Sequence, residues 1–567
     1  MASSSPDRLR IAIAQRNYTV GDLAKNTVLI EESVERARRN GADLVVFSEC
    51  ALLGYPPRDM VERTDLIDRQ LDALERIARL SDEKLGIIVG FIDKNDASRG
   101  KPLRNAAALC HGGRVVGRVA KRLLPTYDVF DEDRYFEPGD RAQIHTFKGV
   151  ELGISVCEDA WNEPDFWERP RYQVDPIAEQ VEAGAELLIN IAASPFHLNK
   201  GEFRRRLLAS HATSLKRSIV FANQIGAHDE LIFDGRSLIV GPNGRVDCRL
   251  AEFEEDFIVR EVPVGERSGA PSPHLRPTCE SRAEQANRAV TLGIRDYFEK
   301  SGFSGAIIGV SGGIDSALTT ALAAEALGAD NILAVTMPTR YTRDISNEDA
   351  ALLAENLGVE FTSIPIEDTF GATLDQLEPS FEGYEPDVTE ENIQARIRGT
   401  TLMALSNKMG RLVLVPSNKS EIAMGYATLY GDMVGALSPL GDCLKTLVYE
   451  MARQLNEVSD GPLIPQRSIE RAPSAELKPD QTDQDALPPY ETLDAILTAY
   501  IHEGRTASKI VQDGFDPQLV DEVLQKLFRA EYKRWQTAPI LKLTPKAFGI
   551  GWRFPLAASY DALRPDD

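Results

Sequence analysis

The chain has 567 residues, which is enough for two or more domains with separate hydrophobic cores. With 43% hydrophobic and 27% charged residues, its composition is that of an ordinary globular protein. The 87 acidic residues outnumber the 64 lysines and arginines and give a net charge of −23, which argues against binding to a nucleic-acid backbone.

The N-terminal segment MASSSPDRLR has no apolar stretch of the kind found in signal peptides. No run of about 18 apolar residues occurs anywhere in the sequence. The six cysteines are scattered, without a CxxC pair or the spacing of a zinc site, and this favours reduced thiols. We therefore expect a cytoplasmic protein that is neither exported nor inserted in a membrane.

Residues 8–264 are predicted to form one α/β domain, in which short apolar runs alternate with segments of helical spacing. Two hairpins are predicted, one turning at residues 112–113 (Gly-Gly) and one at residues 243–244 (Asn-Gly). Because crossovers and hairpins are mixed, we expect a mixed sheet in a layered domain. The predicted strands are 9–15, 43–49, 86–91, 151–159, 186–194 and 218–226, and the predicted helices are 26–39 and 63–80.

Three chemically active side chains stand at the ends of predicted strands. Glu49 closes DLVVFSE, Lys121 closes the hairpin strand GRVVGRVAK, and Cys157 follows the apolar run ELGISV. A buried structural role is the default for a lone cysteine. Strand ends, however, deliver side chains to a shared cleft, and a thiol of pKa about 8.5 needs a nearby base or cation to be nucleophilic.

The segments FSECALLGYPP, KRLLPTYDVFDEDRYF and ISVCEDAW around these residues resemble the nitrilase superfamily, whose Glu-Lys-Cys triad cleaves carbon–nitrogen bonds. The resemblance covers the first domain and implies an αββα sandwich. It implies that Cys157 is the nucleophile that forms a thioester, Glu49 the general base, and Lys121 the cation that stabilises the oxyanion. Cys50 is expected in the core, and Glu132 is either a supporting carboxylate or a solvated loop charge.

Glutaminases of this superfamily that serve a synthetase hold the α-amino and carboxylate groups of glutamine with polar residues near the pocket mouth. The resemblance places Tyr127, Ser194 and Lys200 at these positions. Lys200 also fits a surface lysine. Glutamine is therefore the substrate that the resemblance implies for the first domain.

Residues 265–280 are predicted to link the first domain to a second, 281–567, because GERSGAPSPHLRP is rich in Pro, Gly and Ser without periodicity. The regular alternation that follows predicts a doubly wound parallel sheet with ligands at the carboxyl ends of its strands. The acidic, proline-rich segments 377–389 and 461–489 are expected to be mobile loops over the site. The predicted strands are 306–310, 331–338, 360–366 and 411–418, and the predicted helices include 346–358 and 391–410.

The segment AIIGVSGGIDSALTTALAAEAL, residues 306–327, reads as a strand, a tight glycine turn and a helix. Glycines let backbone N–H groups approach an anion, the hydroxyls of Ser311 and Ser316 add hydrogen bonds, and the helix N-terminus adds a positive dipole end. The GK[ST] ending of a Walker A loop is absent, and Asp315 stands where a lysine would neutralise phosphate. A carboxylate at this position is suited to holding Mg²⁺.

The order SGGxDS resembles the pyrophosphate-binding loop of the ATP pyrophosphatase superfamily, whose members cleave ATP to AMP and PPi and adenylate a substrate. Glu421 follows the strand 411–415, so with Asp315 it would complete an oxygen-rich Mg²⁺ site. Arg396 and Arg398 are two apart on a helix and cannot share a face, so we expect that one reaches phosphate and the other is structural.

The segments NIQARIRG, NKSE, YATLYGDMVG and YKRWQTAPILKLTPKAFG follow this loop in the order of the NAD synthetase family. With the amidase domain in front, the whole chain resembles the bacterial glutamine-dependent members. The resemblance implies that ATP, with Mg²⁺, adenylates deamido-NAD and that ammonia released at Cys157 reaches the adenylate through an internal channel. It implies no tightly bound organic cofactor, and a homo-oligomer, at least a dimer through the C-terminal domain.

This resemblance also implies individual contacts. It places Asn392, Glu421 and Lys533 at deamido-NAD, and it makes Lys419 and Asp432 active-site groups. For ATP it implies Gly309, Val310, Ser311, Gly312, Gly313, Ile314, Asp315, Ser316, Met337 and Pro416.

One departure from the family precedes NKSE, where the family reads threonine and glycine and this chain has Pro416 and Ser417. The family's threonine contacts ATP. Proline offers neither a hydroxyl nor an N–H, and the hydroxyl of Ser417 is a candidate replacement.

Three alternatives remain open. Gly309 to Gly313 also fits the GxSxG nucleophile elbow of a hydrolase, which needs a later histidine, and only His502 follows. A ligase of the same architecture can amidate a different carboxylate. An amidase can also be fused to a nucleotide-binding module without catalysis.

Overall fold

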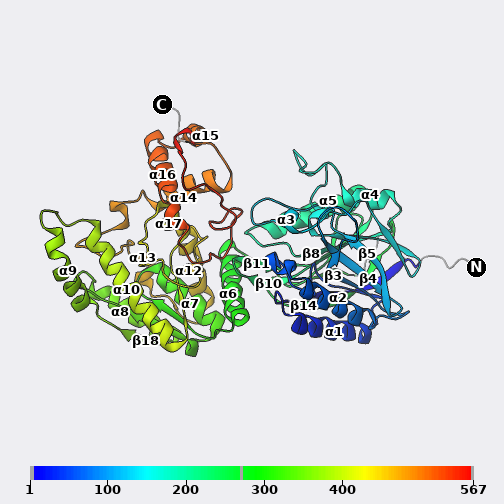
Figure 1. Ribbon diagram of the computed structural model, residues 1–567, viewed down its shortest axis with the longest axis horizontal. Helices are drawn as coiled ribbons and strands as arrows, with labels where there is room; N and C mark the ends of the chain where they lie inside the picture. Colours follow the sequence, from blue (N-terminus) through cyan, green and yellow to red (C-terminus); the bar gives the residue numbers. More distant parts are fainter. Residues whose placement is uncertain (1–5, 268–271, 564–567) are drawn as a thin grey trace, which may run out of the picture. The chain divides into compact units, whose positions relative to one another are not determined.

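The structure, a computed structural model, describes residues 6–267 and 272–563 (Figure 1). The chain forms two compact units that divide between Cys279 and Glu280. Residues 268–271 of the expected linker and residues 564–567 of the expected second domain lie outside the described part. Within the described part, no helix has both the length and the apolar character needed to cross a membrane.

The N-terminal unit consists of two sheets that pack face to face, with helices on their outer sides. In β1 (Arg8–Gln15), Leu9, Ile11 and Ile13 face the core between the sheets, whereas Ala12 and Ala14 face the cluster beneath the outer helices. This alternation is the period of a strand that is buried on both faces. The expected αββα sandwich is therefore confirmed.

Both sheets of this unit are mixed, as expected from the combination of crossovers and hairpins. The first has the order β14-β1-β2-β3-β4-β5 and the second β15-β13-β12-β9-β8-β7-β6. The strands of the first sheet besides β1 are β2 (Leu44–Val46), β3 (Gly86–Lys94), β4 (Leu103–His111), β5 (Arg114–Ala120) and β14 (Asp256–Pro263). Those of the second are β6 (Ile144–Phe147), β7 (Val150–Val156), β8 (Leu187–Ala192), β9 (Ser218–Asn223), β12 (Leu238–Val240), β13 (Val246–Arg249) and β15 (His274–Leu275).

A two-stranded ribbon completes the strands of this unit, and both predicted hairpins are confirmed as β4-β5 and β12-β13. The ribbon consists of β10 (Ile225–His228) and β11 (Leu231–Asp234), so the predicted strand 218–226 divides after Asn223. The helices are α1 (Leu23–Arg39), α2 (Thr64–Ala78), α3 (Glu132–Tyr135), α4 (Pro176–Glu182) and α5 (Lys200–Leu215).

Part of the expected linker belongs to the second sheet. Residues 274–275 form β15, which pairs in parallel with β13 through Cys248 and Arg249. Arg276 continues this attachment, because its backbone N–H donates to the carbonyl of Arg249 and its guanidinium pairs with Asp256. Residues 274–276 are thus fixed to the N-terminal unit.

The C-terminal unit has a four-stranded parallel sheet of order β18-β17-β16-β19, which confirms the doubly wound prediction. The strands are β16 (Ala306–Gly309), β17 (Ile332–Thr336), β18 (Glu360–Ser363) and β19 (Leu412–Leu414). The helices that surround it are α6 (Arg282–Ser301), α7 (Ile314–Leu327), α8 (Asp344–Leu357), α9 (Glu367–Phe381), α10 (Val388–Met409), α11 (Lys419–Met424) and α12 (Lys445–Val458). The order β17, β16, β19 reverses the direction of winding at β16, so a crevice forms at the carboxyl end of that strand.

Most of the remaining helices contribute to a separate apolar cluster near the C-terminus. Val523, Leu524 and Leu527 of α16 are fully buried there together with Trp552. The helices are α13 (Gln466–Glu470), α14 (Tyr490–Leu497), α15 (Ala507–Gln512), α16 (Pro517–Arg529) and α17 (Glu531–Arg534). Among them, α13 contacts α7 and α12 rather than this cluster.

The two segments expected to be loops over the site differ from each other. The first, 377–389, is not a single loop, because α9 runs to Phe381 with Pro379 in its last turn and α10 begins at Val388. A proline near the end of a helix removes only one backbone hydrogen bond, so the helix tolerates it. This segment does not line the nucleotide pocket, whereas 461–489 contributes several of its walls.

Candidate functional sites

Cys157 lies at a sharp turn between β7 and a short 3₁₀ helix, Cys157–Ala160, rather than at the end of a longer strand. Its φ angle is 42°, a conformation that non-glycine residues rarely adopt and that is common at functional sites. The carboxylate of Asp159 holds this turn in place. It accepts the backbone N–H groups of Val156 (3.0 Å), Arg122 (2.9 Å) and Leu123 (2.9 Å), and so ties the turn to the chain just after Lys121.

His211 of α5 supports the far end of the same turn, because its Nε2 lies 3.1 Å from the carbonyl oxygen of Ala160. The ring is fully buried, and burial lowers its pKa to about 4. A folded pKa below the unfolded value of about 6.5 means that the unfolded chain binds the proton more tightly. The stability that neutral His211 contributes is therefore complete above pH 6.5 and is lost as the pH falls towards 4.

We expect acidification from pH 7 to pH 4.5 to lower the free energy of unfolding of the wild-type protein by about 2 kcal/mol more than that of a His211→Gln variant, which cannot take up a proton there. Denaturant unfolding of both proteins across this pH range measures the difference. Parallel stability curves for the two proteins would contradict the assignment of this pH dependence to His211.

Glu49 and Lys121, which the sequence places at two strand ends, meet in the interior beside Cys157. Lys121 Nζ donates to Glu49 Oε1 (2.8 Å) and to Glu132 Oε1 (2.6 Å), and all three side chains are almost completely buried. Glu132 is thus a supporting carboxylate and not a solvated loop charge. Ala193 adds a backbone N–H to Glu49 Oε2 at 2.8 Å.

The electrostatics of this cluster separate the roles of its members. Burial alone would lower the pKa of Lys121, but the negative charges of Glu132 and Glu49 hold that pKa well above its usual value. Burial raises the pKa of Cys157 well above that of a free thiol, and the charge of Glu49 raises it further. The thiol is therefore protonated at rest and needs a base at the moment of attack, while a fixed ammonium stands nearby. Burial also raises the pKa of Glu132 to about 7.

Two residues of this cluster were not predicted from the sequence. Tyr55 donates its hydroxyl to Glu132 Oε1 (2.8 Å), and Asn105 donates its amide to Glu49 Oε1 (2.7 Å) and Glu132 Oε2 (3.3 Å). The available signal for Asn105 was a lone polar side chain within the apolar run of β4. Cys50 is buried as predicted, and its thiol donates to Asn105 Oδ1 (3.5 Å).

The three residues expected to bind glutamine have different surroundings. Tyr127 donates its hydroxyl to both carboxylate oxygens of Glu158 (3.0 and 3.1 Å), beside Cys157 in the sequence. Ser194 is buried and follows Ala193, the residue that donates to Glu49. Lys200 begins α5, and its Nζ donates to the carbonyl of Pro195 (2.6 Å). Tyr127 and Ser194 are thus next to residues of the cluster, and Lys200 is held by the same loop as Ser194.

Glu158 is a candidate that the sequence did not single out. Its carboxylate is buried, accepts a second tyrosine hydroxyl from Tyr172 (2.9 Å), and has its pKa raised by burial. The Arg171 guanidinium lies 3.8 Å from the centre of the Tyr127 ring. A buried carboxylate and an arginine beside one tyrosine match the opposite charges of an amino acid's α-amino and carboxylate groups.

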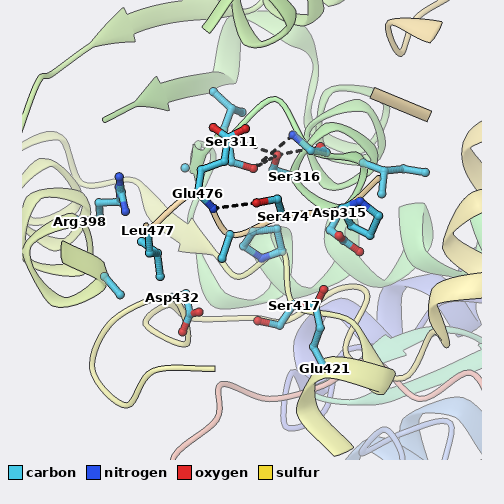
Figure 2. Close-up of a pocket in the computed structure, with 18 of the residues that line it drawn as sticks. Ser311, Asp315, Ser316, Arg398, Ser417, Glu421, Asp432, Ser474, Glu476 and Leu477 are labelled. Carbon is cyan, nitrogen blue, oxygen red and sulfur yellow. Dashed lines mark hydrogen bonds between the residues drawn. The ribbon is translucent and has the colours of Figure 1, made fainter. Parts of the chain in front are cut away.

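In the C-terminal unit, a pocket of about 270 Å³ opens at the carboxyl end of β16 (Figure 2). Figure 2 shows Ser311 and Ser316 on one side of it and Asp432, Ser417 and Glu421 on the other. Of the predicted nucleotide and metal residues, the lining includes Gly309, Val310, Ser311, Gly313, Ile314, Asp315, Ser316, Met337, Pro416 and Glu421.

Gly312, the remaining residue of the predicted loop, is not among the residues that line the pocket. It is buried beneath the turn with φ +75°, and a Cβ there would lie 2.4 Å from the carbonyl oxygen of Ser346. Glycine is required at this position by close packing and by its backbone conformation. The hydroxyls of Ser311 and Ser316 are 3.4 Å apart above it.

Lys445, which no motif indicated, stands between the two predicted metal ligands. Its Nζ donates to Asp315 Oδ2 (2.5 Å) and to Glu421 Oε1 (3.1 Å). Burial alone would lower the pKa of Lys445, but these carboxylates raise it, so its ammonium is charged. Burial raises the pKa of Glu421 to about 8, although Lys445 partly offsets this.

The two carboxylates fit a magnesium ion that completes its shell elsewhere. Asp315 and Glu421 converge on one cation position, and Mg²⁺ in nucleotide sites is typically held by one or two carboxylates together with phosphate oxygens and water. Within the described part of the chain, no cluster of three or more His, Cys, Asp or Glu side chains could hold a metal by itself. These residues therefore do not form a metal site made of protein ligands alone.

Residues after the predicted strands and residues of segment 461–489 form the other walls of the pocket. Arg398 faces the pocket and donates Nε to the carbonyl of Met337 (3.1 Å), whereas Arg396 is exposed and bonds to Leu429. The two arginines therefore separate as predicted. Both Pro416, which replaces the family's threonine, and the adjacent Ser417 line the pocket. Ser417 therefore brings a hydroxyl to the pocket one position after the missing threonine.

The chain between α13 and residue 477 lies over the SGGIDS turn. Arg471 donates to the carbonyl of Gly312 (3.0 Å) and to the hydroxyl of Ser346 (3.0 Å). Glu476 accepts from the same hydroxyl (2.7 Å) and from Arg343 (2.6 Å). These bonds explain why a segment with little regular structure forms a wall of the pocket.

The residues expected at deamido-NAD gather around the loop 425–432. Lys533 donates to the carbonyls of Gly425 (2.8 Å) and Ala427 (2.7 Å), and Asn392 accepts the hydroxyl of Thr428 (2.6 Å). Asp432 at the end of the loop lines the nucleotide pocket, and burial raises its pKa to about 6. Asn392 and Lys533 contact this loop but are not part of that pocket's lining.

Lys419 does not line the pocket, which corrects its expected place in the active site. Its Nζ is buried among Asp442 (2.6 Å), Thr544 (2.8 Å) and the ring of His502 (2.7 Å). His502 is therefore committed to this cluster, and Ser311 bonds to Ser316 instead. The hydrolase alternative, which needs a histidine at the serine, finds no support in this geometry.

Comparison with known proteins was consistent with both sites. The carbon-nitrogen hydrolase family model matches residues 10–270, and the NAD synthase family model matches residues 286–537. A glutamine-dependent NAD(+) synthetase of Synechocystis is 40% identical over 97% of this chain and 99% of its own length. One of Thermotoga maritima is also 40% identical, over 97% of this chain and 98% of its own.

Two solved structures match nearly the whole chain. Glutamine-dependent NAD+ synthetase from Acinetobacter baumannii, in complex with ADP, has a TM-score of 0.75 at 36% identity and covers 97% of this chain and 98% of its own. The synthetase from Cytophaga hutchinsonii has a TM-score of 0.82 at 21% identity, with 98% of each chain covered, and supports the fold alone.

Proposed function

Because the chain belongs to the family of glutamine-dependent NAD(+) synthetases, we propose that its two sites divide that reaction between the residues described above. The enzyme is a ligase that uses glutamine as the nitrogen donor. The buried Cys157 cluster releases ammonia, and the pocket at the SGGIDS turn activates the carboxylate that accepts it.

In the first site, Cys157 Sγ attacks the carboxamide carbon of glutamine while the thiol proton moves to Glu49. The Lys121 ammonium stabilises the oxyanion that forms. When the carbon–nitrogen bond breaks, Glu49 returns the proton to nitrogen, so ammonia leaves and a thioester remains. Water then attacks the thioester, with Glu49 as base, and gives glutamate and free thiol. Tyr127, Ser194 and Lys200 are proposed to bind glutamine, and Glu158 to receive its α-ammonium group.

In the second site, a carboxylate oxygen of deamido-NAD attacks the α-phosphorus of ATP and the bond to the β-phosphate oxygen breaks, releasing PPi. Ammonia then attacks the acyl carbon of the adenylate, the bond to the AMP oxygen breaks, and the attacking nitrogen loses a proton, so that NAD and AMP form. The proposed phosphate ligands are the backbone N–H groups of the turn, the hydroxyls of Ser311 and Ser316, and the ammonium of Lys445, and the pocket that these residues share supports this assignment. Asn392, Glu421 and Lys533 are proposed to bind deamido-NAD.

Asp315 and Glu421 would hold magnesium that enters with ATP, where it supplies positive charge against the phosphate oxygens. Lys445 keeps the two carboxylates paired until then. The walls formed by 471–477 and by the loop 425–432 limit the access of water to an adenylate that would otherwise hydrolyse.

We further propose a glutaminase domain at 8–264, a linker at 265–280 and a synthetase domain at 281–567, in a cytoplasmic protein. All six cysteines are free thiols, as expected in a reducing compartment. We also propose a homo-oligomer, at least a dimer through the C-terminal domain, on the basis of the resemblance to the family.

The observation that carries the proposal is the buried Glu49–Lys121 pair beside a thiol, in the same chain as an Asp315–Lys445–Glu421 pocket. Titration with deamido-NAD, in the presence of a nonhydrolysable ATP analogue, tests the identity of the acceptor. We expect binding that a Lys533→Met variant weakens on the order of tenfold, because an ionic hydrogen bond is lost. The exposed Lys526→Met is the matched control. Absence of binding to wild type would favour a different carboxylate substrate.

A further inference from the structure

Asn105 on β4 is a buried side chain that the reaction scheme above does not use. It is 1% exposed, and its amide points at the catalytic cluster rather than at the surrounding apolar core. Its Nδ2 donates both of its hydrogens, to Glu49 Oε1 (2.7 Å) and to Glu132 Oε2 (3.3 Å). Its backbone carbonyl accepts the N–H of Lys121 (2.8 Å). One residue therefore touches both carboxylates and the lysine.

An uncharged donor at this position solves an electrostatic problem. Glu49 and Glu132 are two carboxylates in a buried site, and a single ammonium, Lys121, lies between them. Two carboxylates in one site disfavour each other's ionisation. An asparagine amide offers one N–H to each without adding a charge, whereas aspartate would add a third negative charge and serine has only one hydrogen to give.

The contacts of Glu49 also leave its two oxygens unequal. Oε1 accepts from both Asn105 and Lys121, whereas Oε2 accepts from the backbone of Ala193. A carboxylate oxygen has two lone-pair positions, so Oε1 is filled by these contacts and Oε2 keeps one position open. Of the two oxygens, Oε2 is therefore the one with a position left to accept a proton.

We propose that Asn105 is a positioning residue of the glutaminase reaction: it fixes the Glu49 carboxylate with Oε2 as the proton acceptor and keeps Glu49 and Glu132 on opposite sides of Lys121. This inference rests on the proposed roles of Cys157, Glu49 and Lys121. The titratable groups that face Glu132 and the amide are Glu49, Lys121, Tyr55, Cys50 and Cys157.

The test replaces Asn105 by aspartate and, separately, by alanine in the full-length enzyme. NAD formation from glutamine is measured as a function of pH, and NAD formation from ammonium chloride is measured on the same samples. We expect glutamine-dependent kcat to fall on the order of 10²-fold in both variants, because the base is misplaced. In Asn105→Asp we expect the acidic limb of the pH profile of glutamine-dependent activity to move to higher pH. The reason is that a third carboxyl group makes the cluster harder to deprotonate. Ammonium-dependent synthesis stays at the wild-type level.

Asn26→Asp is the matched control, because Asn26 is an equally buried asparagine whose side-chain amide, among the described residues, bonds to the backbone of Thr19 and Leu52 and to no charged group. It is expected to lower stability without moving the pH profile. A merely structural Asn105 would lower activity with an unmoved acidic limb, and that result overturns the inference, as does wild-type activity in Asn105→Ala. Cys157→Ala, assayed in parallel, separates the two hypotheses: if it retains glutamine-dependent synthesis, the proposed triad itself is wrong.

Discussion

A Cys157→Ala variant is expected to lose synthesis of NAD from glutamine by at least roughly 10³-fold while keeping synthesis from ammonium salts. Alanine removes the only atom that can form the thioester and leaves the buried cluster of Glu49, Lys121 and Glu132 in place. The site that we propose to use ammonia lies in the C-terminal unit, and its chemistry needs no thiol. Steady-state NAD formation with each nitrogen source, on the same preparation, measures the ratio.

Cys110→Ala is the matched control for this variant, because Cys110 is a fully buried cysteine of β4 whose side chain belongs to the apolar core beneath the helices. Cys110→Ala should lower the free energy of unfolding because it leaves a small cavity. It should not change the ratio of NAD formation from glutamine to NAD formation from ammonium. If both nitrogen sources fail equally in folded Cys157→Ala protein, ammonia cannot be made at one site and used at the other.

Much of this arrangement could be predicted because secondary structure places side chains by rule. Glu49 and Lys121 interrupt apolar runs after β2 and β5, which run in the same direction in one sheet, so their carboxyl ends lie at the same edge. The SGGIDS turn carries its own local signals, since glycines, hydroxyls and a helix N-terminus follow one another in the sequence. Local patterns of this kind gave the fold class and the pocket.

The errors and omissions share a different origin. Lys445 reaches Asp315 from 130 residues away, with no motif around it, and Asn105 reaches Glu49 from another strand. Lys419 was misplaced because it adjoins Asn418 in NKSE. Successive residues of a helix point about 100° apart, so Asn418 bonds Asp315 while Lys419 turns into the interior. Contacts between distant segments depend on packing that a local pattern does not contain.

An Asp315→Asn variant is expected to lose release of pyrophosphate, with deamido-NAD and saturating ammonium as substrates, on the order of 10³-fold. The amide has the shape of the carboxylate but no charge, so it removes one of the two anionic oxygens that face Lys445 and would face magnesium. We also expect a higher magnesium concentration for half-maximal activity. Release of glutamate from glutamine, measured separately, should persist at least in part, because that chemistry needs none of these groups.

The control for this charge removal is Asp330→Asn, an exposed aspartate just before β17 that does not line the pocket. Both proteins are assayed for pyrophosphate across a magnesium titration. If Asp315→Asn releases pyrophosphate like the control, the turn binds a nucleotide without using it, and the synthetase chemistry must lie elsewhere in the chain. A loss restricted to Asp315→Asn, with glutamate release retained, instead requires that the SGGIDS turn activates the acceptor while the thiol site works independently of that charge.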